Sequence, residues 1–160
     1  MVVLARQRHL HRARRPTVRA YEASGGSVWG ETELSGTILA VDDSRTIRDL
    51  IEFVLTGAGY RTIVATDGKD ALEKLGGIKP ELVITDINMP KMNGYDFIRA
   101  ARGIGAMQDV PILVLTTEFD EDIKSKVREL GANGWIAKPF NPTQLLETVK
   151  RVAPSAAAAA

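Results

Sequence analysis

Acidic, hydroxyl and amino side chains follow four short apolar runs of this sequence. In chain order they are Asp42 and Asp43, Asp86, Thr116 and Thr117, and Lys138 with Pro139. Three carboxylates held close together repel one another and require a cation, and oxygen ligands without His or Cys suit Mg²⁺. Such a set could transfer a phosphoryl group. Asp86 would be the nucleophile, Mg²⁺ and Lys138 would neutralise phosphoryl charge, and a threonine hydroxyl would bind a phosphoryl oxygen.

Each of these residues also has an ordinary structural explanation when it is taken alone. The two acids before Ser44 could cap a helix, and Asp86 could form an Asx-turn. Lys138 could be a surface lysine, and Thr116 a β-branched strand residue. The signal lies in the whole set and its order along the chain.

These side chains need a scaffold, and the hydrophobic pattern predicts alternating strands and helices. Short runs without charge predict buried strands at 37–41, 60–65, 81–85, 112–115 and 135–137. Helical spacing predicts five helices: after Ser44, after Asp67, around 97–101, over 120–130 and over 142–152. Connections of this length favour an α/β fold, a doubly wound five-stranded parallel sheet with helices on both faces. The carboxyl ends of its strands lie at one edge, so the reactive side chains should converge there.

Composition excludes several kinds of chemistry. There is no cysteine, and both histidines, His9 and His11, lie before residue 35. Disulfides are excluded, and the folded part lacks the residues for Ser-His-Asp, Cys-His and zinc chemistry. No apolar run approaches the ~20 residues of a membrane span, so we expect no membrane partner and a cytoplasmic location.

The first 35 residues do not have the pattern of a folded domain. Six arginines occur in residues 1–20, whereas the remainder is slightly acidic, so no specific nucleic-acid partner is expected for the whole chain. We expect residues 1–35 to be a basic, disordered extension or a misassigned start; an arm that binds an anionic partner is the alternative. Residues 36–152 would form the domain, and 153–160 a frayed alanine-rich tail.

Four motifs together resemble the signature of two-component response-regulator receiver domains. They are Ile38-Leu39-Ala40-Val41-Asp42-Asp43-Ser44, Thr85-Asp86-x-x-Met89-Pro90-x-Met92-x-Gly94, Leu115-Thr116 and Lys138-Pro139-Phe140. The resemblance covers about residues 36–152. It implies the flavodoxin-like (βα)5 fold with strand order 2-1-3-4-5.

The resemblance also implies a role for each site residue. Asp86 would be the phosphoacceptor. Asp43, Asp86 and the main-chain carbonyl of Asn88 would bind Mg²⁺ directly, and Asp42 would act through water. Thr116 would be the switch hydroxyl and Lys138 the phosphate-contacting lysine. The Lys138–Pro139 peptide bond would be cis, a form found in about 5–6% of X-Pro bonds.

Within this family the chain is most similar to the single-domain, CheY-like chemotaxis type. Asn88 and Glu118, which would flank the acceptor pocket, match that type. Thr117 stands where many relatives have Ala, which would narrow access to the phosphoryl group and slow its hydrolysis. Trp135 stands where the chemotaxis type has a switching Tyr, and Trp is larger and offers only an N–H donor. We interpret Trp135 as a partner-docking anchor; a strand residue half covering the sheet edge is the alternative.

The resulting hypothesis is a phosphorylation-activated switch. A partner histidine kinase (CheA-like) would be the phosphodonor, because the folded part has no histidine. Signalling would use the face made by 119–130, 135–137 and 142–152, and would reach an output protein such as a flagellar-motor component. Only residues 153–160 follow the last helix, too few for a DNA-binding domain, so we expect output through protein contact. We also expect a monomer that catalyses only its own phosphorylation and dephosphorylation.

One alternative role remains open, and two other functions are disfavoured by the residues at the site. The chain could be a phosphotransfer intermediate or the receiver of a pathway other than chemotaxis. A haloacid-dehalogenase-like phosphatase would need a second acid where Asn88 stands. A nucleotide-binding Rossmann domain would need a glycine-rich loop after the first strand, where Asp42, Asp43, Ser44 and Arg45 stand instead.

Overall fold

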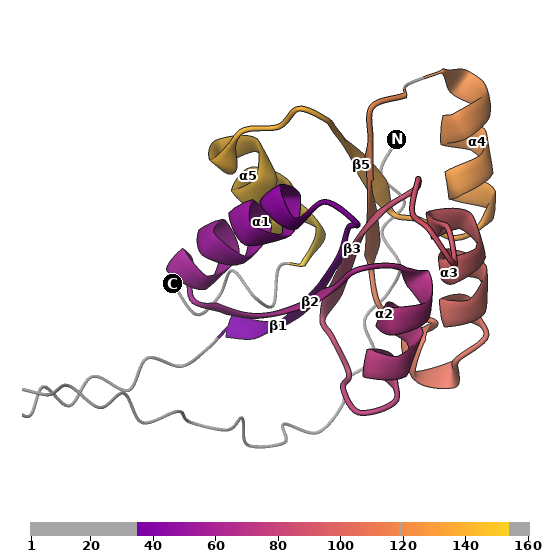
Figure 1. Ribbon diagram of the computed structural model, residues 1–160, viewed down its shortest axis with the longest axis horizontal. Coiled ribbons are helices and arrows are strands. Elements are labelled where there is room, and N and C mark those ends of the chain that lie inside the picture. The colour runs from indigo at the N-terminus through magenta and orange to yellow at the C-terminus, as the bar shows by residue number, and fades with distance from the viewer. Residues whose placement is uncertain (1–34, 119, 154–160) are drawn as a thin grey trace, which may run out of the picture. The chain divides into compact units, whose positions relative to one another are not determined.

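The computed structural model of the protein describes residues 35–118 and 120–153. The expectations for the basic extension and for the alanine-rich tail lie outside the described residues, except that Ser35 is part of the first strand and Ala153 is the buried C-cap of the last helix. The elements are, in chain order, β1 (Ser35–Val41), α1 (Arg45–Gly57), β2 (Tyr60–Ala65), α2 (Gly68–Leu75), β3 (Leu82–Asp86), α3 (Gly94–Arg102), the 3-10 helix η1 (Gly105–Met107), β4 (Ile112–Thr116), α4 (Glu121–Glu129), β5 (Gly134–Ala137) and α5 (Pro142–Val152) (Figure 1).

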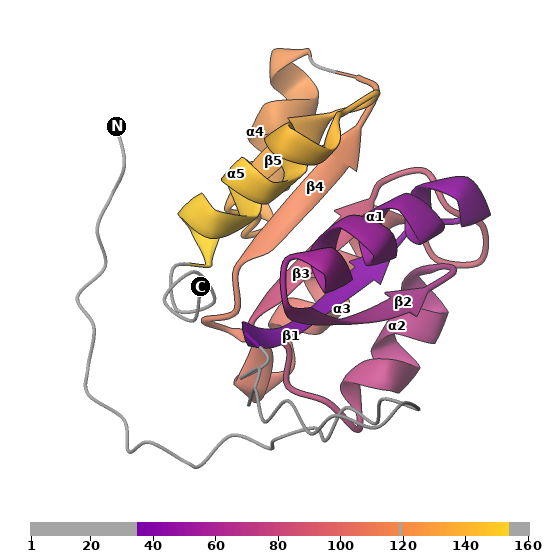
Figure 2. The ribbon, with the colours of Figure 1, turned by 90° about the vertical axis from the view of Figure 1, so that its left-hand side faces the viewer.

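The five strands form one parallel sheet in the order β2-β1-β3-β4-β5. Helices α1 and α5 cover one face, and α2, α3 and α4 cover the other (Figures 1 and 2). This confirms the predicted doubly wound sheet and its strand order. Because all the pairs are parallel, β1, β3, β4 and β5 end at the same edge.

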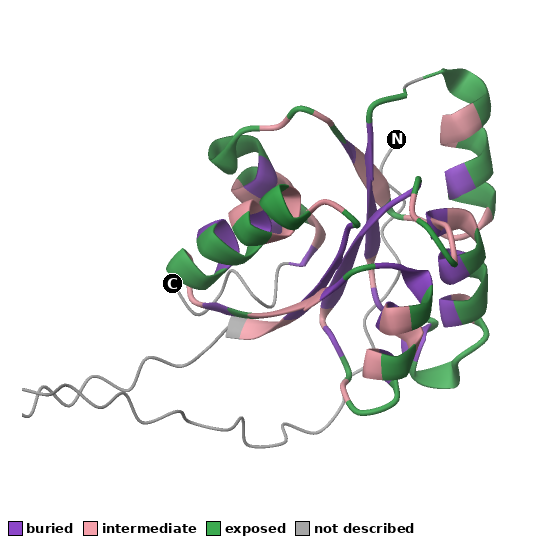
Figure 3. Ribbon diagram, viewed as in Figure 1, coloured by how far each residue is buried: buried purple, intermediate pink, exposed green. Residues whose placement is uncertain are grey.

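Each face of the sheet has its own hydrophobic core. Ile51 and Leu55 of α1 pack with Leu145 and Val149 of α5 on one face. The other face contains side chains of α2, α3 and α4, with Phe97 fully buried among them. Figure 3 shows that the central strands are buried, and every residue of β3 and β4 is buried. The uninterrupted apolar runs of the sequence are therefore explained by helices on both sides of these strands.

The N-terminal ends of the helices are fixed by capping side chains. Ser44 caps α1 and Asp67 caps α2, each accepting hydrogen bonds from backbone N–H groups of the first turn, as predicted. Asn141 and Gln144 form a reciprocal capping box at α5. These caps fix where each helix starts after the strand-end residues.

No helix in the described ranges is long and apolar enough to cross a membrane.

Several predicted boundaries were wrong by one or two residues, and one element was missed. Asp86 and Thr116 still pair with neighbouring strands, so β3 and β4 each extend one residue further than predicted. Helix α4 is shorter than the predicted 120–130, because Asp120 is its N-cap and Leu130 its C-cap. The three-residue η1 was missed because it is too short to have a hydrophobic period.

Candidate functional site

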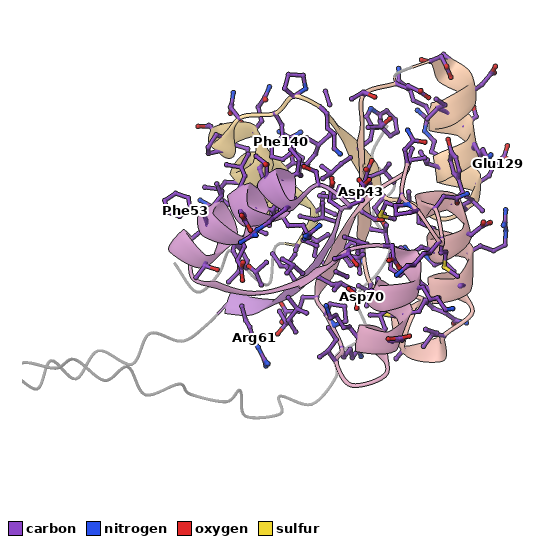
Figure 4. The ribbon with its side chains drawn as sticks, viewed as in Figure 1. Asp43, Phe53, Arg61, Asp70, Glu129 and Phe140 are labelled. Carbon is purple, nitrogen blue, oxygen red and sulfur yellow. The ribbon has the colours of Figure 1, made fainter. Side chains whose placement is uncertain are left out.

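Three acidic side chains lie at the carboxyl ends of the adjacent strands β1 and β3. Oxygens of Asp42, Asp43 and Asp86 lie within 4.8 Å of one another. Asp42 and Asp86 are buried, whereas Asp43 is exposed where β1 leads into α1 (Figure 4). All donors are hard carboxylate oxygens and one of them faces solvent, so the cluster fits Mg²⁺, which keeps several waters when a protein binds it.

Asp42 is held by three parts of the chain. Its Oδ1 accepts a hydrogen bond from the N–H of Ser44 at 2.8 Å, and its Oδ2 accepts one from Nζ of Lys138 at 2.7 Å. Its backbone carbonyl accepts a hydrogen bond of 2.7 Å from the guanidinium of Arg48. Both carboxylate oxygens of this fully buried side chain therefore have a partner.

Asp86 is less fully neutralised than Asp42. Its Oδ1 accepts a hydrogen bond from the N–H of Ile87 at 2.7 Å, and its Oδ2 lies 3.3 Å from Nζ of Lys138. Burial raises the pKa of Asp86, the charge of Asp42 raises it further, and Lys138 opposes the shift. Burial alone would lower the pKa of Lys138, but Asp42 and then Asp86 raise it above its ordinary value. The ammonium is therefore charged and shared between two carboxylates.

The loop after Asp86 is tightly constrained. A Cβ at Gly94 would lie 2.2 Å from the carbonyl oxygen of Asp86, so only glycine fits there. The N–H of Gly94 donates to the carbonyl of Ile87 at 2.8 Å. Further along, Lys91 has φ 63°, and a hydrogen bond of 2.7 Å from the N–H of Met92 to the carbonyl of Pro90 closes a γ-turn. These turns fold the loop back beside the site and leave Asn88 exposed.

Thr116 lies at the end of β4 and is buried. Its hydroxyl donates to the carbonyl of Glu118 at 3.1 Å and accepts from the N–H of Glu118 at 3.0 Å. Thr117 and Glu118 are exposed. Within the described residues, the hydroxyl of Thr116 is thus bonded to the loop that follows it, and it is not bonded to Asp86.

Trp135 lies on β5, opposite Val114 of β4, and is half-buried. Two cations of α4 lie over its indole ring: Nζ of Lys124 at 5.8 Å and Cζ of Arg128 at 5.0 Å from the ring centroid. At the end of the same strand the Lys138–Pro139 peptide bond is cis. The indole ring of Trp135 is therefore partly covered by α4 and partly exposed.

Sequence reasoning missed Arg48, Lys124 and Arg128. The i, i+4 spacing of Lys124 and Arg128 places them on one face of a helix, which was a usable signal. Their contact with Trp135 also depends on how α4 packs against β5, which the sequence pattern does not specify. No sequence pattern indicates the role of Arg48, because the group that accepts its hydrogen bond is a backbone carbonyl.

Comparisons with known proteins identify a family that the chain resembles over the described domain. The family profile of the response regulator receiver domain matches residues 38–150. The chain is 37% identical over 117 residues to chemotaxis protein CheY1 of Helicobacter pylori, covering 72% of this chain and 94% of that protein. It is also 37% identical over 115 residues to the transcriptional regulatory protein PhoP of Bacillus subtilis, of which the match spans only 47%.

Solved structures that share the fold include two receiver proteins. Chemotaxis response regulator CheY4 of Vibrio cholerae has a TM-score of 0.71 and 43% identity, covering 72% of this chain and 97% of that one. The receiver domain of the sensor histidine kinase PA1611 from Pseudomonas aeruginosa has a TM-score of 0.70 and 27% identity, covering 75% and 98%. That second structure has a magnesium ion coordinated in its active-site cleft.

Proposed function

The chain belongs to the response regulator receiver domain family, and from this membership we propose that it is a signalling switch activated by phosphorylation of Asp86. One observation carries the proposal. A buried carboxylate at the end of a central strand lies beside two further acids and 3.3 Å from an ammonium group. This arrangement supports the proposal, because the carboxylate that would attack phosphorus lies beside a positive charge that would neutralise a phosphoryl group.

The proposed reaction transfers a phosphoryl group from a phosphohistidine of a partner kinase. A carboxylate oxygen of Asp86 attacks phosphorus, the P–N bond breaks, and the electron pair stays on the imidazole, which takes up a proton. Water later attacks the aspartyl phosphate, orthophosphate leaves, and the carboxylate is restored. Lys138 neutralises phosphoryl oxygens in both steps, and Thr117 and Glu118 border the approach of the attacking water.

Asp43 and Asp86, with the main-chain carbonyl of Asn88, would hold Mg²⁺ directly, and Asp42 would act through water. When bound, the ion would supply positive charge to the transferring phosphoryl group. The donor chemistry supports this assignment, because three carboxylates lie together and the ammonium group of Lys138 pairs with only two of them, Asp42 and Asp86.

The switch would operate through Thr116. We infer that its hydroxyl leaves Glu118 and binds a phosphoryl oxygen once Asp86 is phosphorylated. The loop from Thr116 to α4 would then rearrange, and the side chains of α4 that lie over the ring of Trp135 would move with it. The surface of α4, β5 and α5 would be the output face, and Trp135 its anchor for an output protein.

The similarity to CheY1 and CheY4 favours chemotaxis, with a CheA-like kinase as phosphodonor, a flagellar-motor component as output and the cytoplasm as location. The chain is equally identical to PhoP, which favours a second candidate function: the receiver or phosphotransfer intermediate of another two-component pathway. Affinity capture with the chain, with and without beryllium fluoride and Mg²⁺ as phosphoryl mimic, distinguishes the two. Mimic-dependent retention of a motor protein supports the first, and retention of a second phosphotransferase supports the other.

Labelling with radioactive acetyl phosphate and Mg²⁺ tests the acceptor assignment. We expect the wild-type chain to be labelled and Asp86→Asn to be unlabelled. Asp96→Asn is the matched control, because Asp96 is an exposed aspartate of α3 that pairs only with nearby Arg99 among the described residues. Undiminished labelling of Asp86→Asn would overturn the assignment.

A further inference from the structure

Arg102, at the end of α3, joins two loops that are distant in sequence. Its guanidinium donates to the carbonyls of Met107 and Val110 on one side, the latter at 2.7 Å. On the other side it donates to the carbonyl of Gly131 at 2.7 Å and to Oδ1 of Asn133 at 3.2 Å. The side chain is half-buried, and burial lowers its pKa. The planar fork of arginine donors suits this multiple bonding.

The second of these loops connects α4 to β5 and is fixed again at β4. Asn133 Oδ1 accepts a hydrogen bond from the N–H of Ile112 at 2.9 Å, and its own N–H donates to the carbonyl of Ile112 at 2.8 Å. Gly131 has φ +93°, and a Cβ there would lie 3.0 Å from Nε of Arg102. The C-terminal end of α4 is therefore fastened to α3 and to β4.

The N-terminal half of α4 is held by side-chain contacts. Val127 is the only buried residue of the helix, most of which is exposed (Figure 3). Ile123 packs against the core, and Nζ of Lys126 lies 3.9 Å from the ring centroid of Tyr95 on α3. The N-terminal end of α4 follows directly on the loop in which Thr116 bonds to Glu118. One end of α4 thus adjoins the acceptor site, and the other end is anchored away from it.

We propose that Arg102 is a positioning residue that makes the C-terminal end of α4 a fixed pivot. This inference rests on the proposed function. A rearrangement that starts at Thr116 then displaces the N-terminal half of α4, while the half next to Gly131 stays in place. As a result, Lys124 moves relative to the ring of Trp135, and Arg128, one turn nearer the anchor, keeps its contact.

Hydrogen–deuterium exchange on the full chain, with and without beryllium fluoride and Mg²⁺, tests this pivot. In the wild type we expect the mimic to change exchange at residues 120–126 and to leave residues 128–134 unchanged. In Arg102→Gln we expect residues 128–134 to exchange about tenfold faster without the mimic, and the response to spread over all of α4. Arg99→Gln, an exposed arginine of the same helix, is the control and should match the wild type.

A second variant and a second readout distinguish loss of the pivot from a general loss of stability and from failure of the proposed function. Gly131→Ala should spread the response in the same direction, while exchange in β1 and β3 stays unchanged; a general loss of stability would raise exchange there too. Acetyl-phosphate labelling of Arg102→Gln should remain within about twofold of the wild type. An unlabelled wild type would refute the proposed function itself. A labelled wild type that responds uniformly through residue 134, or an Arg102→Gln variant with the wild-type pattern, would overturn the pivot.

Discussion

The ammonium group of Lys138 lies 2.7 Å from the buried carboxylate of Asp42, although the two residues are 96 positions apart in the sequence. This is a shorter contact than the 3.3 Å between Lys138 and Asp86. The lysine therefore neutralises Asp42 more completely, and Asp86 remains a buried carboxylate with an adverse neighbour. Ionised Asp86 is therefore held at a cost to the stability of the fold, which fits the acceptor role that we propose for it.

This cost predicts that Asp86→Asn stabilises the protein when no metal is present. The pKa of Asp86 is raised by folding, so the folded state binds its proton more tightly than the unfolded chain does. Ionised Asp86 therefore lowers the unfolding free energy, and this destabilisation is complete above the folded-state pKa. It disappears as the pH falls toward the pKa of the unfolded chain, about 3.9. Urea unfolding in EDTA should show a gain of about 0.5–2 kcal/mol at pH 7 and a smaller gain at acidic pH. A variant that is less stable at pH 7 would contradict this.

Mg²⁺ should stabilise the wild type through Asp43. Ligand binding to the folded state adds RT ln(1 + [L]/Kd), about 1.4 kcal/mol at ten times Kd. Because Asp43 is exposed, Asp43→Asn should unfold normally in EDTA but lose most of the rise in Tm on adding Mg²⁺. Ca²⁺ should have a smaller effect on both chains. An equal rise in Tm for the variant and the wild type would show that the ion binds elsewhere.

Thr116→Ala should uncouple phosphorylation from the output face. The variant loses the hydroxyl that now bonds to Glu118 and that we expect to bind the phosphoryl group. Acetyl-phosphate labelling of Asp86 should persist, whereas the exchange response to beryllium fluoride at residues 120–126 should be lost. Thr116→Ser keeps the hydroxyl and should restore the response. If Thr116→Ala responds like the wild type, this hydroxyl does not carry the signal.

Gly94→Ala should damage both the fold and the site. The Cβ of the alanine would lie 2.2 Å from the backbone oxygen of Asp86. Because this clash is with the backbone, no side-chain movement can relieve it. We expect a loss of about 1–3 kcal/mol of unfolding free energy, together with slower labelling. Gly57→Ala is the matched control, because a Cβ at Gly57 meets no atom within 4 Å and alanine favours the helix. Equal stabilities for the two variants would contradict the proposed packing.

The sequence predicted the parts of this structure that depend on local patterns. Apolar runs such as Leu82–Ile84 identified the buried strands, and strand-end residues such as Asp42 and Asp86 could be assigned to one edge because parallel strands end together. Helix starts at Ser44 and Asp67 followed from capping chemistry.

The parts that were missed depend on which backbone groups the fold brings to each side chain. Arg102 binds carbonyls of two loops, and Arg48 binds the carbonyl of Asp42; neither acceptor is visible in a list of side chains. The present partner of Thr116 was also missed, because Glu118 offers its backbone and not its carboxylate. The stronger pairing of Lys138 with Asp42 depends on distances that only the folded chain defines.

The most direct test of the central claim is to locate the phosphoryl group itself. An aspartyl phosphate is reduced by borohydride to homoserine, so mass spectrometry of the acetyl-phosphate-treated and reduced chain can identify the modified residue. We expect homoserine at position 86, dependent on Mg²⁺ and absent from Asp86→Asn. Homoserine at another aspartate, or a labelled chain with an unmodified Asp86, would contradict it.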